Sequence, residues 1–382
     1  MKILLACQQS PHLYPLPAYG FWRTYFVHGL REAGHEVVEV PQADWARGLL
    51  PLPATELARW RGDTWTRTLD CARDTAGLDL FLGYLYPQQI EVSAVKALRV
   101  RGLPAVNFFC DNVREYRRLP AEFSSFDLNW VPEFEALPLY AGRGWKALFA
   151  PMPCWVPPDR RRVPDAETGD LCFIGRADSL RRDLLRQVAK AGLPLALAGA
   201  GWAPVDAEAS VPPRPTWRAR IEDWADYCRR QGVLRTGRRL LRPRPPPTDS
   251  VFDFSPWLRS APDDEEYTRL LAESAVSIGI NRYPDPSAAR PAVYSRLRDI
   301  EAPMLGACHL TEWAPELPYL FDIEREIAVY HDAEELISQA RSLLTDAPRR
   351  RRLREAGARR AHADHSVGRT IARVAQALGL SA

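Results

Sequence analysis

Short apolar runs alternate with longer stretches of helical periodicity along most of the chain. Residues 2–7 form a continuous apolar run, as expected for a strand that is covered on both faces of a parallel sheet. Residues 21–33 have helical periodicity and end before Gly34, and residues 35–40 form the next apolar run. This order of strand, loop, helix, glycine and strand predicts a Rossmann-like unit.

Further apolar runs extend this first unit to a predicted six-stranded sheet. The four additional strands are expected at residues 78–84, 104–110, 127–131 and 145–150, with a helix at 92–101. The loop after the first strand lacks the glycine-rich sequence of dinucleotide sites, so we do not expect a dinucleotide there.

A second α/β unit follows a proline-rich segment. Residues 151–170 contain five prolines and several charges, which is typical of an interdomain linker. Strands are then expected at residues 171–175, 194–198 and 276–281, and helices at 179–191, 334–345, 349–363 and 367–380. The pattern predicts two domains, residues 1–152 and 153–366, followed by a helix in 367–382.

The segment 294–313 carries the most informative chemistry. It is predicted to be a helix that ends at Gly306 and leads into a short buried strand. Arg298 and Glu301 are three residues apart and therefore share one helix face. A carboxylate can accept both hydroxyls of a ribose, and arginines with helix N–H groups match a diphosphate. The same spacing also fits a solvated surface ion pair.

The amino-acid sequence in and after this segment resembles that of a known family. LRDIEAPMLGACHLTEW, followed by PELPYLFDIEREIAVYHDAEELISQARSLLTD and REAGARRAHADHS, resembles group 1 glycosyltransferases, in particular the spore-maturation (CgeB-like) branch. The resemblance implies a GT-B fold, in which two Rossmann-like domains face each other across a cleft. Residues 1–152 would then be the acceptor domain, 153–366 the nucleotide-sugar-binding domain, and 367–382 a helix that packs on the N-terminal domain.

The resemblance also implies roles for individual residues. Glu301 stands where the family holds the nucleotide ribose. Retaining members carry two glutamates separated by seven residues, and here Val293 occupies the first of these positions, which leaves the stereochemistry open. Gly175 and Arg176, at the first strand–helix turn of the second domain, stand where the family faces the departing phosphate.

The loop 281–290 ends a predicted strand at its carboxyl end, where open α/β sheets bind ligands. Asn281 begins this loop, and Arg290, Arg296 and Arg298 are candidates for matching the diphosphate charge. Gly306 is a candidate for close backbone approach to the nucleotide, besides its role in ending the helix.

Two residues of the first domain are candidates for the base that accepts a proton from the acceptor hydroxyl. Asp111 ends an apolar strand, and its alternative role is an N-cap of the next helix. His12 lies in the first loop, where a polar surface residue is the alternative.

Composition and charge narrow the function further. The net charge of +3 is too small to indicate nucleic-acid binding. The basic runs 235–248 and 349–354 have two interpretations, a solvated face or a surface that contacts an anionic partner. Seven scattered cysteines without a C-x-x-C pair favour a reducing compartment and exclude a zinc or disulfide framework. Abundant arginine and the 34 prolines are typical of a high-GC bacterial genome.

We therefore expect a cytoplasmic glycosyltransferase of the hexosyltransferase type, without a transmembrane segment. It would move a sugar from a nucleoside-diphosphate sugar to an unidentified acceptor, with no cofactor and no metal. Two alternatives are a sugar-nucleotide-binding protein without turnover and a basic protein that binds nucleic acid through residues 235–244.

Overall fold

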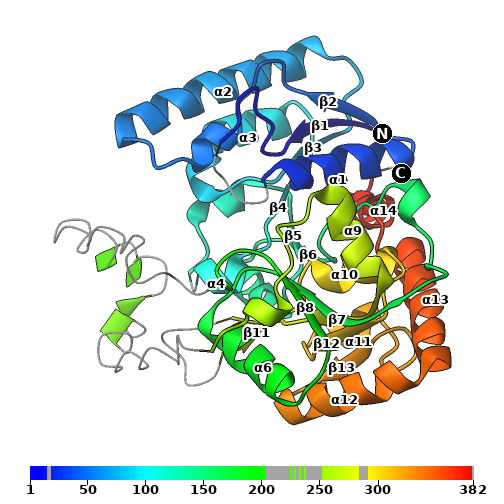
Figure 1. Ribbon diagram of the computed structural model, residues 1–382. Helices are drawn as coiled ribbons and strands as arrows, with labels where there is room; N and C mark the ends of the chain where they lie inside the picture. The colour runs from blue at the N-terminus through cyan, green and yellow to red at the C-terminus, as the bar shows by residue number, and fades with distance from the viewer. Residues whose placement is uncertain are drawn as a thin grey trace. The chain divides into compact units, whose positions relative to one another are not determined.

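The structure is a computed structural model in which the chain forms two compact units (Figure 1). It describes residues 1–14, 19–116, 118–203, 252–283 and 291–380, together with residues 224, 225, 227, 228, 232, 233, 236 and 237. Unit 1 comprises Met1–Trp155 and Asp364–Ala382, and unit 2 comprises Val156–Ala363. The sequence predicts these two boundaries at residues 152 and 366.

Unit 1 is built on a parallel sheet in the order β2-β1-β3-β4-β5-β6. Its strands are β1 (Lys2–Ala6), β2 (Glu36–Glu39), β3 (Leu80–Gly83), β4 (Ala105–Phe108), β5 (Leu128–Val131) and β6 (Ala147–Phe149). Its helices include α1 (Tyr19–Glu32), α2 (Ala54–Asp74), α3 (Val92–Val100), α4 (Asn112–Glu115) and α5 (Leu137–Ala141). The predicted six-stranded sheet is confirmed, because continuous apolar runs are what a sheet covered on both faces requires.

Helix α2 was not predicted from the sequence, although it has 21 residues. Its buried face is formed by Trp60, Thr64, Trp65 and Thr68, so two polar residues lie where the search for an amphipathic helix expects apolar ones. The hydroxyl of Thr68 donates to the carbonyl of Thr64 at 2.8 Å. The Trp65 indole donates to the carbonyl of Gln89 at 2.7 Å. These bonds satisfy polar groups that the apolar pattern could not anticipate.

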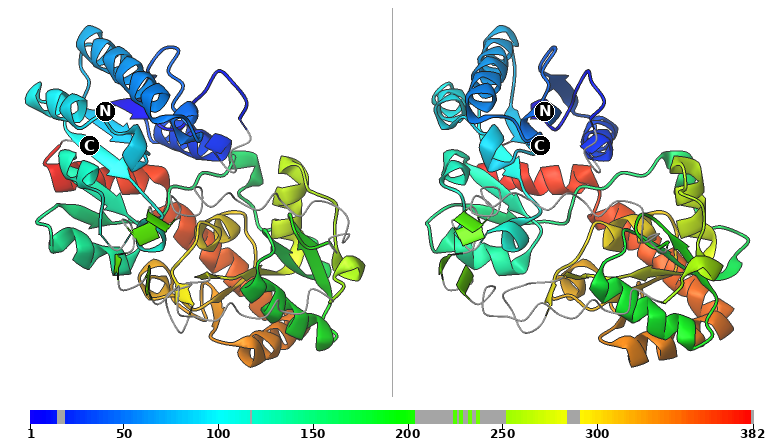
Figure 2. Two further views of the ribbon diagram at one scale, coloured as in Figure 1. Left: turned by 90° about the vertical axis from the view of Figure 1, so that its left-hand side faces the viewer. Right: turned by 60° about the vertical axis from the view of Figure 1, so that its left-hand side comes forward.

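Helix α14 (Val367–Leu378) belongs to unit 1, although it follows unit 2 in the chain. It packs against α1, and Figure 2 shows this red helix beside the blue and cyan elements of unit 1. Glycines allow the close approach: a Cβ on Gly29 would lie 2.6 Å from the Cβ of Val367. A Cβ on Gly368 would lie 2.6 Å from that of Ala33.

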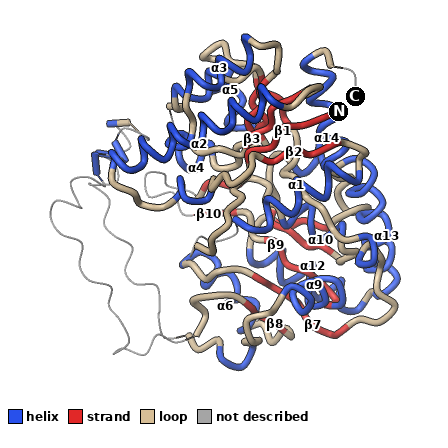
Figure 3. The backbone as a smooth tube through the Cα atoms, turned by 90° about the horizontal axis from the view of Figure 1, so that it is seen from above, coloured by secondary structure: helices blue, strands red, loops and turns tan. Residues whose placement is uncertain are grey.

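Unit 2 contains a second parallel sheet, in the order β13-β12-β9-β7-β8. Strands are drawn in red in Figure 3. Its strands are β7 (Thr168–Ile174), β8 (Leu195–Ala198), β9 (Ser274–Gly279), β12 (His309–Glu312) and β13 (Ala328–Tyr330). Among the described residues, its helices include α6 (Ser179–Lys190), α9 (Asp264–Glu273), α10 (Arg298–Met304), α11 (Leu317–Leu320), α12 (Ala333–Thr345) and α13 (Ala347–Asp364). The strands β10 (Arg282–Tyr283) and β11 (Ala292–Val293) pair antiparallel. The direction of strand succession reverses between β7 and β9, which makes their carboxyl ends the expected place for a ligand.

Two arginines of α13 correct the expectation that residues 349–354 form a solvated face. Arg354 is fully buried and donates to the carbonyls of Gly306 at 2.9 Å and Ser274 at 2.6 Å. Its Nε lies 2.8 Å from Glu167, which also accepts from Arg350. Arg350 and Arg354 therefore tie α13 to the interior of unit 2, because each buried guanidinium finds several acceptors, whereas Arg351 and Arg352 are exposed.

Candidate functional site

The carboxyl ends of β7 and β9 bring several of the predicted site residues to one edge of the unit 2 sheet. Gly175 and Arg176 follow β7 directly, and Asn281 lies two residues after β9. Helix α10 begins at the same edge, because it lies in the connection between the parallel strands β9 and β12 and such a helix runs antiparallel to the strands. The topology therefore places the candidate residues at the switch point of the sheet.

Arg298 and Glu301 form an ion pair on α10, as their spacing predicted. Arg298 Nε lies 3.3 Å from Glu301 Oε2. The hydroxyl of Tyr267, on α9, donates to the same carboxylate oxygen, and the Arg298 guanidinium lies 5.0 Å from the centre of the Tyr267 ring. The Glu301 side chain is only 6% exposed. A solvated surface pair is therefore excluded, and the carboxylate is oriented by two partners.

Asp299, next to this pair, accepts hydrogen bonds from several segments of unit 2 and was missed by sequence reasoning. It is fully buried and accepts from the Thr311 hydroxyl at 2.6 Å, the Ser295 hydroxyl at 3.0 Å and the Arg296 amide at 2.9 Å. His309 Nε2 lies 3.0 Å away. Burial alone would raise the pKa of Asp299, but its contacts with His309, Thr311 and the Arg296 amide outweigh burial and lower that pKa.

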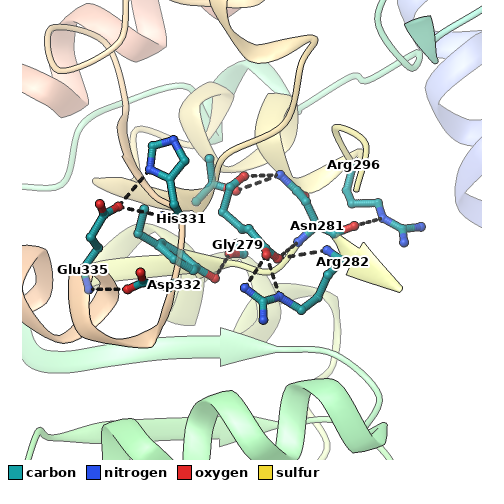
Figure 4. Close-up of polar contacts among 10 residues, drawn as sticks. Gly279, Asn281, Arg282, Arg296, His331, Asp332 and Glu335 are labelled. Carbon is teal, nitrogen blue, oxygen red and sulfur yellow. Dashed lines mark hydrogen bonds and ion pairs between the residues drawn. The ribbon is translucent and has the colours of Figure 1, made fainter. Parts of the chain in front are cut away.

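Asn281 is part of the core of this edge (Figure 4). Its side-chain nitrogen donates to Asp299 at 3.0 Å and to the carbonyl of Glu312 at 2.8 Å, and the residue is 1% exposed. The amide nitrogen of Asn281 thus joins the end of β9 to the start of α10. Its part in the nucleotide-sugar site stays a prediction.

The buried Glu312, at the end of β12, fixes the residues that follow β9. Its carboxylate accepts the amides of Asn281 at 3.1 Å and Arg282 at 2.9 Å, and it pairs with the Arg282 guanidinium. Glu316 acts similarly on the segment just before α10, where its carboxylate accepts the Ser295 amide at 3.0 Å. The sequence carries one signal for Glu312, a carboxylate at the end of an apolar run, which is the same signal that predicts Asp111.

Arg296 is held by tyrosines. Its Nη1 donates to the Tyr294 hydroxyl at 2.6 Å, and its guanidinium lies 4.0 Å from the centre of the Tyr294 ring and 5.5 Å from that of Tyr283. Figure 4 shows its remaining bond, from Nε to the carbonyl of Asn281 at 3.4 Å. Arg290 lies outside the described residues, as does most of the basic segment 235–248.

Gly175 and Arg176 lie at the carboxyl end of β7, as predicted. The Gly175 carbonyl accepts from the Trp202 indole at 2.7 Å. A Cβ on Gly199 would approach that carbonyl oxygen to 2.4 Å. Trp202 is 1% exposed and packs in the core, which identifies it as a core residue. Arg176 is exposed at this edge, so its side chain is accessible to a ligand.

Gly306 lies at the opposite edge of the sheet from these residues. It follows the C-terminal end of α10, with a φ of +73°, and precedes β12. A Cβ there would lie 2.8 Å from the carbonyl oxygen of Arg162. The prediction that Gly306 ends the helix is confirmed, whereas its proposed approach to the nucleotide does not fit this position. The close neighbour that requires a glycine is the protein's own backbone.

In unit 1, Asp111 and His12 follow β4 and β1, which are not neighbours in the sheet. Asp111 occupies the N-cap position of α4 without a side-chain capping hydrogen bond, so the alternative role as a cap is not realised. Its Oδ1 lies 3.6 Å from Arg114. His12 is exposed, and its ring centre lies 6.1 Å from that of Tyr14.

Among the described residues, no group of three or more His, Cys, Asp or Glu side chains could hold a metal ion. Within the same part of the chain, no helix is both long enough and apolar enough to cross a membrane.

Comparison with known proteins places this geometry in context. Residues 253–376, which include Glu301 and the segments around it, match a family model described as "Glycosyl transferase-like". This part of the chain is therefore similar to the group 1-like glycosyltransferases. No curated protein matches the chain. The spore-maturation branch stays a prediction.

Solved structures resemble the whole chain. HepE of Anabaena in complex with UDP-glucose has a TM-score of 0.56 at 12% identity, covering 99% of each chain. Sucrose-phosphate synthase of Thermosynechococcus elongatus has a TM-score of 0.53 at 15% identity, covering 99% of this chain and 98% of that one. AviGT4, a glycosyltransferase involved in avilamycin A biosynthesis, has a TM-score of 0.52 at 17% identity, with coverages of 98% and 96%. The predicted GT-B fold with two Rossmann-like domains is confirmed.

Proposed function

We propose that the protein is a glycosyltransferase that moves a sugar from a nucleoside-diphosphate sugar to an acceptor hydroxyl, without a divalent metal. The main observation is Glu301, an almost fully buried carboxylate that Tyr267 and Arg298 orient at the switch point of the unit 2 sheet. It lies in the segment that matches the glycosyltransferase-like family. A nucleotide-binding carboxylate must be fixed in this way to recognise both hydroxyls of a ribose.

The donor is proposed to bind at the carboxyl edge formed by β7 and β9. The Glu301 carboxylate accepts hydrogen bonds from the ribose hydroxyls. These bonds replace the hydrogen bond from Tyr267 or form in addition to it. Arg176 and Arg298 stabilise the diphosphate, whose negative charge increases as the sugar leaves. Arg290 remains a third candidate. HepE, whose structure contains UDP-glucose, supports a uridine nucleotide as the first donor to examine.

The acceptor is proposed to be activated by unit 1. Asp111 takes the proton from the acceptor hydroxyl as that oxygen attacks the anomeric carbon, and His12 is the second candidate. Because Val293 replaces the first glutamate of retaining family members, we propose a single displacement that inverts the anomeric carbon.

A donor screen tests this proposal. Isothermal titration with UDP-glucose and other sugar nucleotides measures binding, and release of nucleoside diphosphate in the presence of an acceptor mixture measures turnover. Binding together with release that depends on acceptor supports a transferase. A chain that binds no sugar nucleotide would contradict the proposal.

One observation favours the non-catalytic alternative. Val293 is paired with Arg282 in the β10–β11 hairpin, so the position of the missing glutamate is built into a structural element. Tight donor binding without turnover by any acceptor would select this alternative.

A further inference from the structure

A buried carboxyl group in unit 1 contacts the backbone next to Asp111. Glu133 lies two residues after β5 and has no exposed surface. Its Oε2 accepts the backbone amide of Asn112 at 3.0 Å. Asn112 follows Asp111 and is the first residue of α4, so the carboxyl group of Glu133 holds the peptide that carries Asp111.

Asn112 fixes the same turn from its side chain. Its Nδ2 donates to the carbonyl of Phe109 at 2.7 Å, and its Oδ1 accepts from the Tyr140 hydroxyl at 2.8 Å. Asn112 and Tyr140 are both fully buried. The backbone is therefore restrained on both sides of Asp111, at Phe109 before it and at Asn112 after it.

The identity of residue 133 is costly for a purely structural contact. Burying a carboxyl group is expensive unless every polar atom is paired. Oε1 of Glu133 has no hydrogen-bond partner among the residues that the structure describes. Burial, followed by the nearby charge of Asp111, raises the pKa of Glu133 well above its ordinary value, although the bonds from Asn112 and Val113 oppose this.

We propose that Glu133 is a positioning residue that sets the location of the Asp111 carboxylate through the Asn112 amide. The inference rests on the proposed function, because it assigns Glu133 a role in the step for which Asp111 is the base. Proton transfer requires hydrogen-bond reach between base and hydroxyl, and a displacement of about 1 Å can reduce a rate by about 10²-fold.

Three variants and one control test the inference. Glu133→Leu removes the acceptor at similar volume, Glu133→Gln keeps an acceptor oxygen, and Tyr140→Phe loosens Asn112 while keeping the ring. Glu135→Leu changes an exposed glutamate two residues away in the same segment and serves as the matched control. Each protein is measured for UDP-glucose affinity, for kcat and acceptor KM, and for hydrogen exchange of the Asn112 amide.

Glu133→Leu is expected to lose protection of the Asn112 amide and to lower kcat by roughly 10²-fold, with donor affinity unchanged. Glu133→Gln should restore kcat to within about threefold of wild type, and Tyr140→Phe should lower it by about three- to tenfold. Glu135→Leu should behave as wild type. If Glu133→Leu does not fold, a Tyr140→Phe protein that loses protection of the Asn112 amide but keeps the wild-type kcat overturns the inference.

The possible failures are distinguishable. An active wild type in which Glu133→Leu turns over as fast as Glu133→Gln overturns the inference alone. A wild type that binds UDP-glucose and transfers nothing overturns the inference together with the proposed transferase activity. A fall in donor affinity in Glu133→Leu also overturns it, because the effect would then not be confined to the base.

Discussion

At the scale of single residues, Glu301 shows which parts of the candidate site are visible in a sequence. Its ion pair with Arg298 follows from helix geometry alone, because residues three apart share a face. Its second partner, Tyr267, lies 34 residues earlier in the chain, and no local pattern brings the two together. The family resemblance identified the residue, and only the structure revealed how it is oriented.

Replacing Glu301 by alanine should weaken donor binding. The ribose loses a charged hydrogen-bond acceptor, which corresponds to roughly 1.5–3 kcal/mol of binding free energy, or about one to two orders of magnitude in Kd. Titration calorimetry with UDP-glucose measures this change, and Glu334→Ala, an exposed position on α12, is the control. Unchanged affinity in a folded Glu301→Ala protein would remove Glu301 from the nucleotide site.

Replacing Asp111 by asparagine should slow turnover while leaving donor binding intact. Loss of a general base lowers the rate by about 10²–10⁴-fold. Because the Asp111 side chain makes no capping bond, the substitution should not destabilise α4. Steady-state kinetics and NMR of the product's anomeric carbon measure both aspects. Full activity in Asp111→Asn would shift the role of base to His12, and a retained configuration would exclude single-step inversion.

At the scale of elements, the strands of the unit 1 sheet and β7, β8, β9 and β12 of the unit 2 sheet were predictable, because continuous apolar runs report burial on two faces. Strand β13, which has three residues, was not predicted. Helix α2 was not predicted, because Thr64 and Thr68 interrupt its buried face. The hydrogen-bond network around α10 was also not predictable from the sequence. Asp299 and Glu312 act on segments 18 to 31 residues away, and hydrogen bonds over such separations leave no periodic signal in the sequence.

Arg354 gives a prediction at this scale. In Arg354→Met, the carbonyls of Gly306 and Ser274 lose their donor and Glu167 loses a partner. Each unsatisfied buried acceptor costs roughly 1–3 kcal/mol, so the free energy of unfolding should fall by at least about 3 kcal/mol. Urea unfolding measures the change. Arg351→Met, at an exposed position one turn earlier, should alter it little. If wild type and Arg354→Met have the same free energy of unfolding, Arg354 does not stabilise the packing of α13.

At the scale of the whole molecule, stability should decline at acid pH through Asp299. Its folded-state pKa lies below the ordinary value, so its contribution is present above about pH 4, the unfolded value. That contribution is lost as the pH falls through the lower folded-state pKa. Denaturant unfolding from pH 7 to 3 measures this, with Asp299→Asn for comparison. The variant should be less stable at pH 7, and its difference from wild type should shrink towards pH 3. A constant difference would contradict the assignment.

Sugar transfer by the whole protein should not depend on a divalent metal. Arginines and backbone N–H groups are proposed to match the diphosphate charge. Activity assays after extensive EDTA treatment should therefore retain the wild-type rate. Activity that is abolished by EDTA and restored by magnesium or manganese would show that the arginines do not suffice.

The glycine-mediated contact between α1 and α14 has a consequence for biosynthesis. During translation, all of unit 2 emerges from the ribosome before α14 does, so the surface of α1 around Gly29 has no partner until late. Domains usually fold as they are synthesised, N-terminal first. Here the N-terminal unit must wait for the last helix. A nascent chain that is stalled before residue 364 should therefore bind chaperones through α1. Chaperone binding should end when synthesis continues and the chain includes α14.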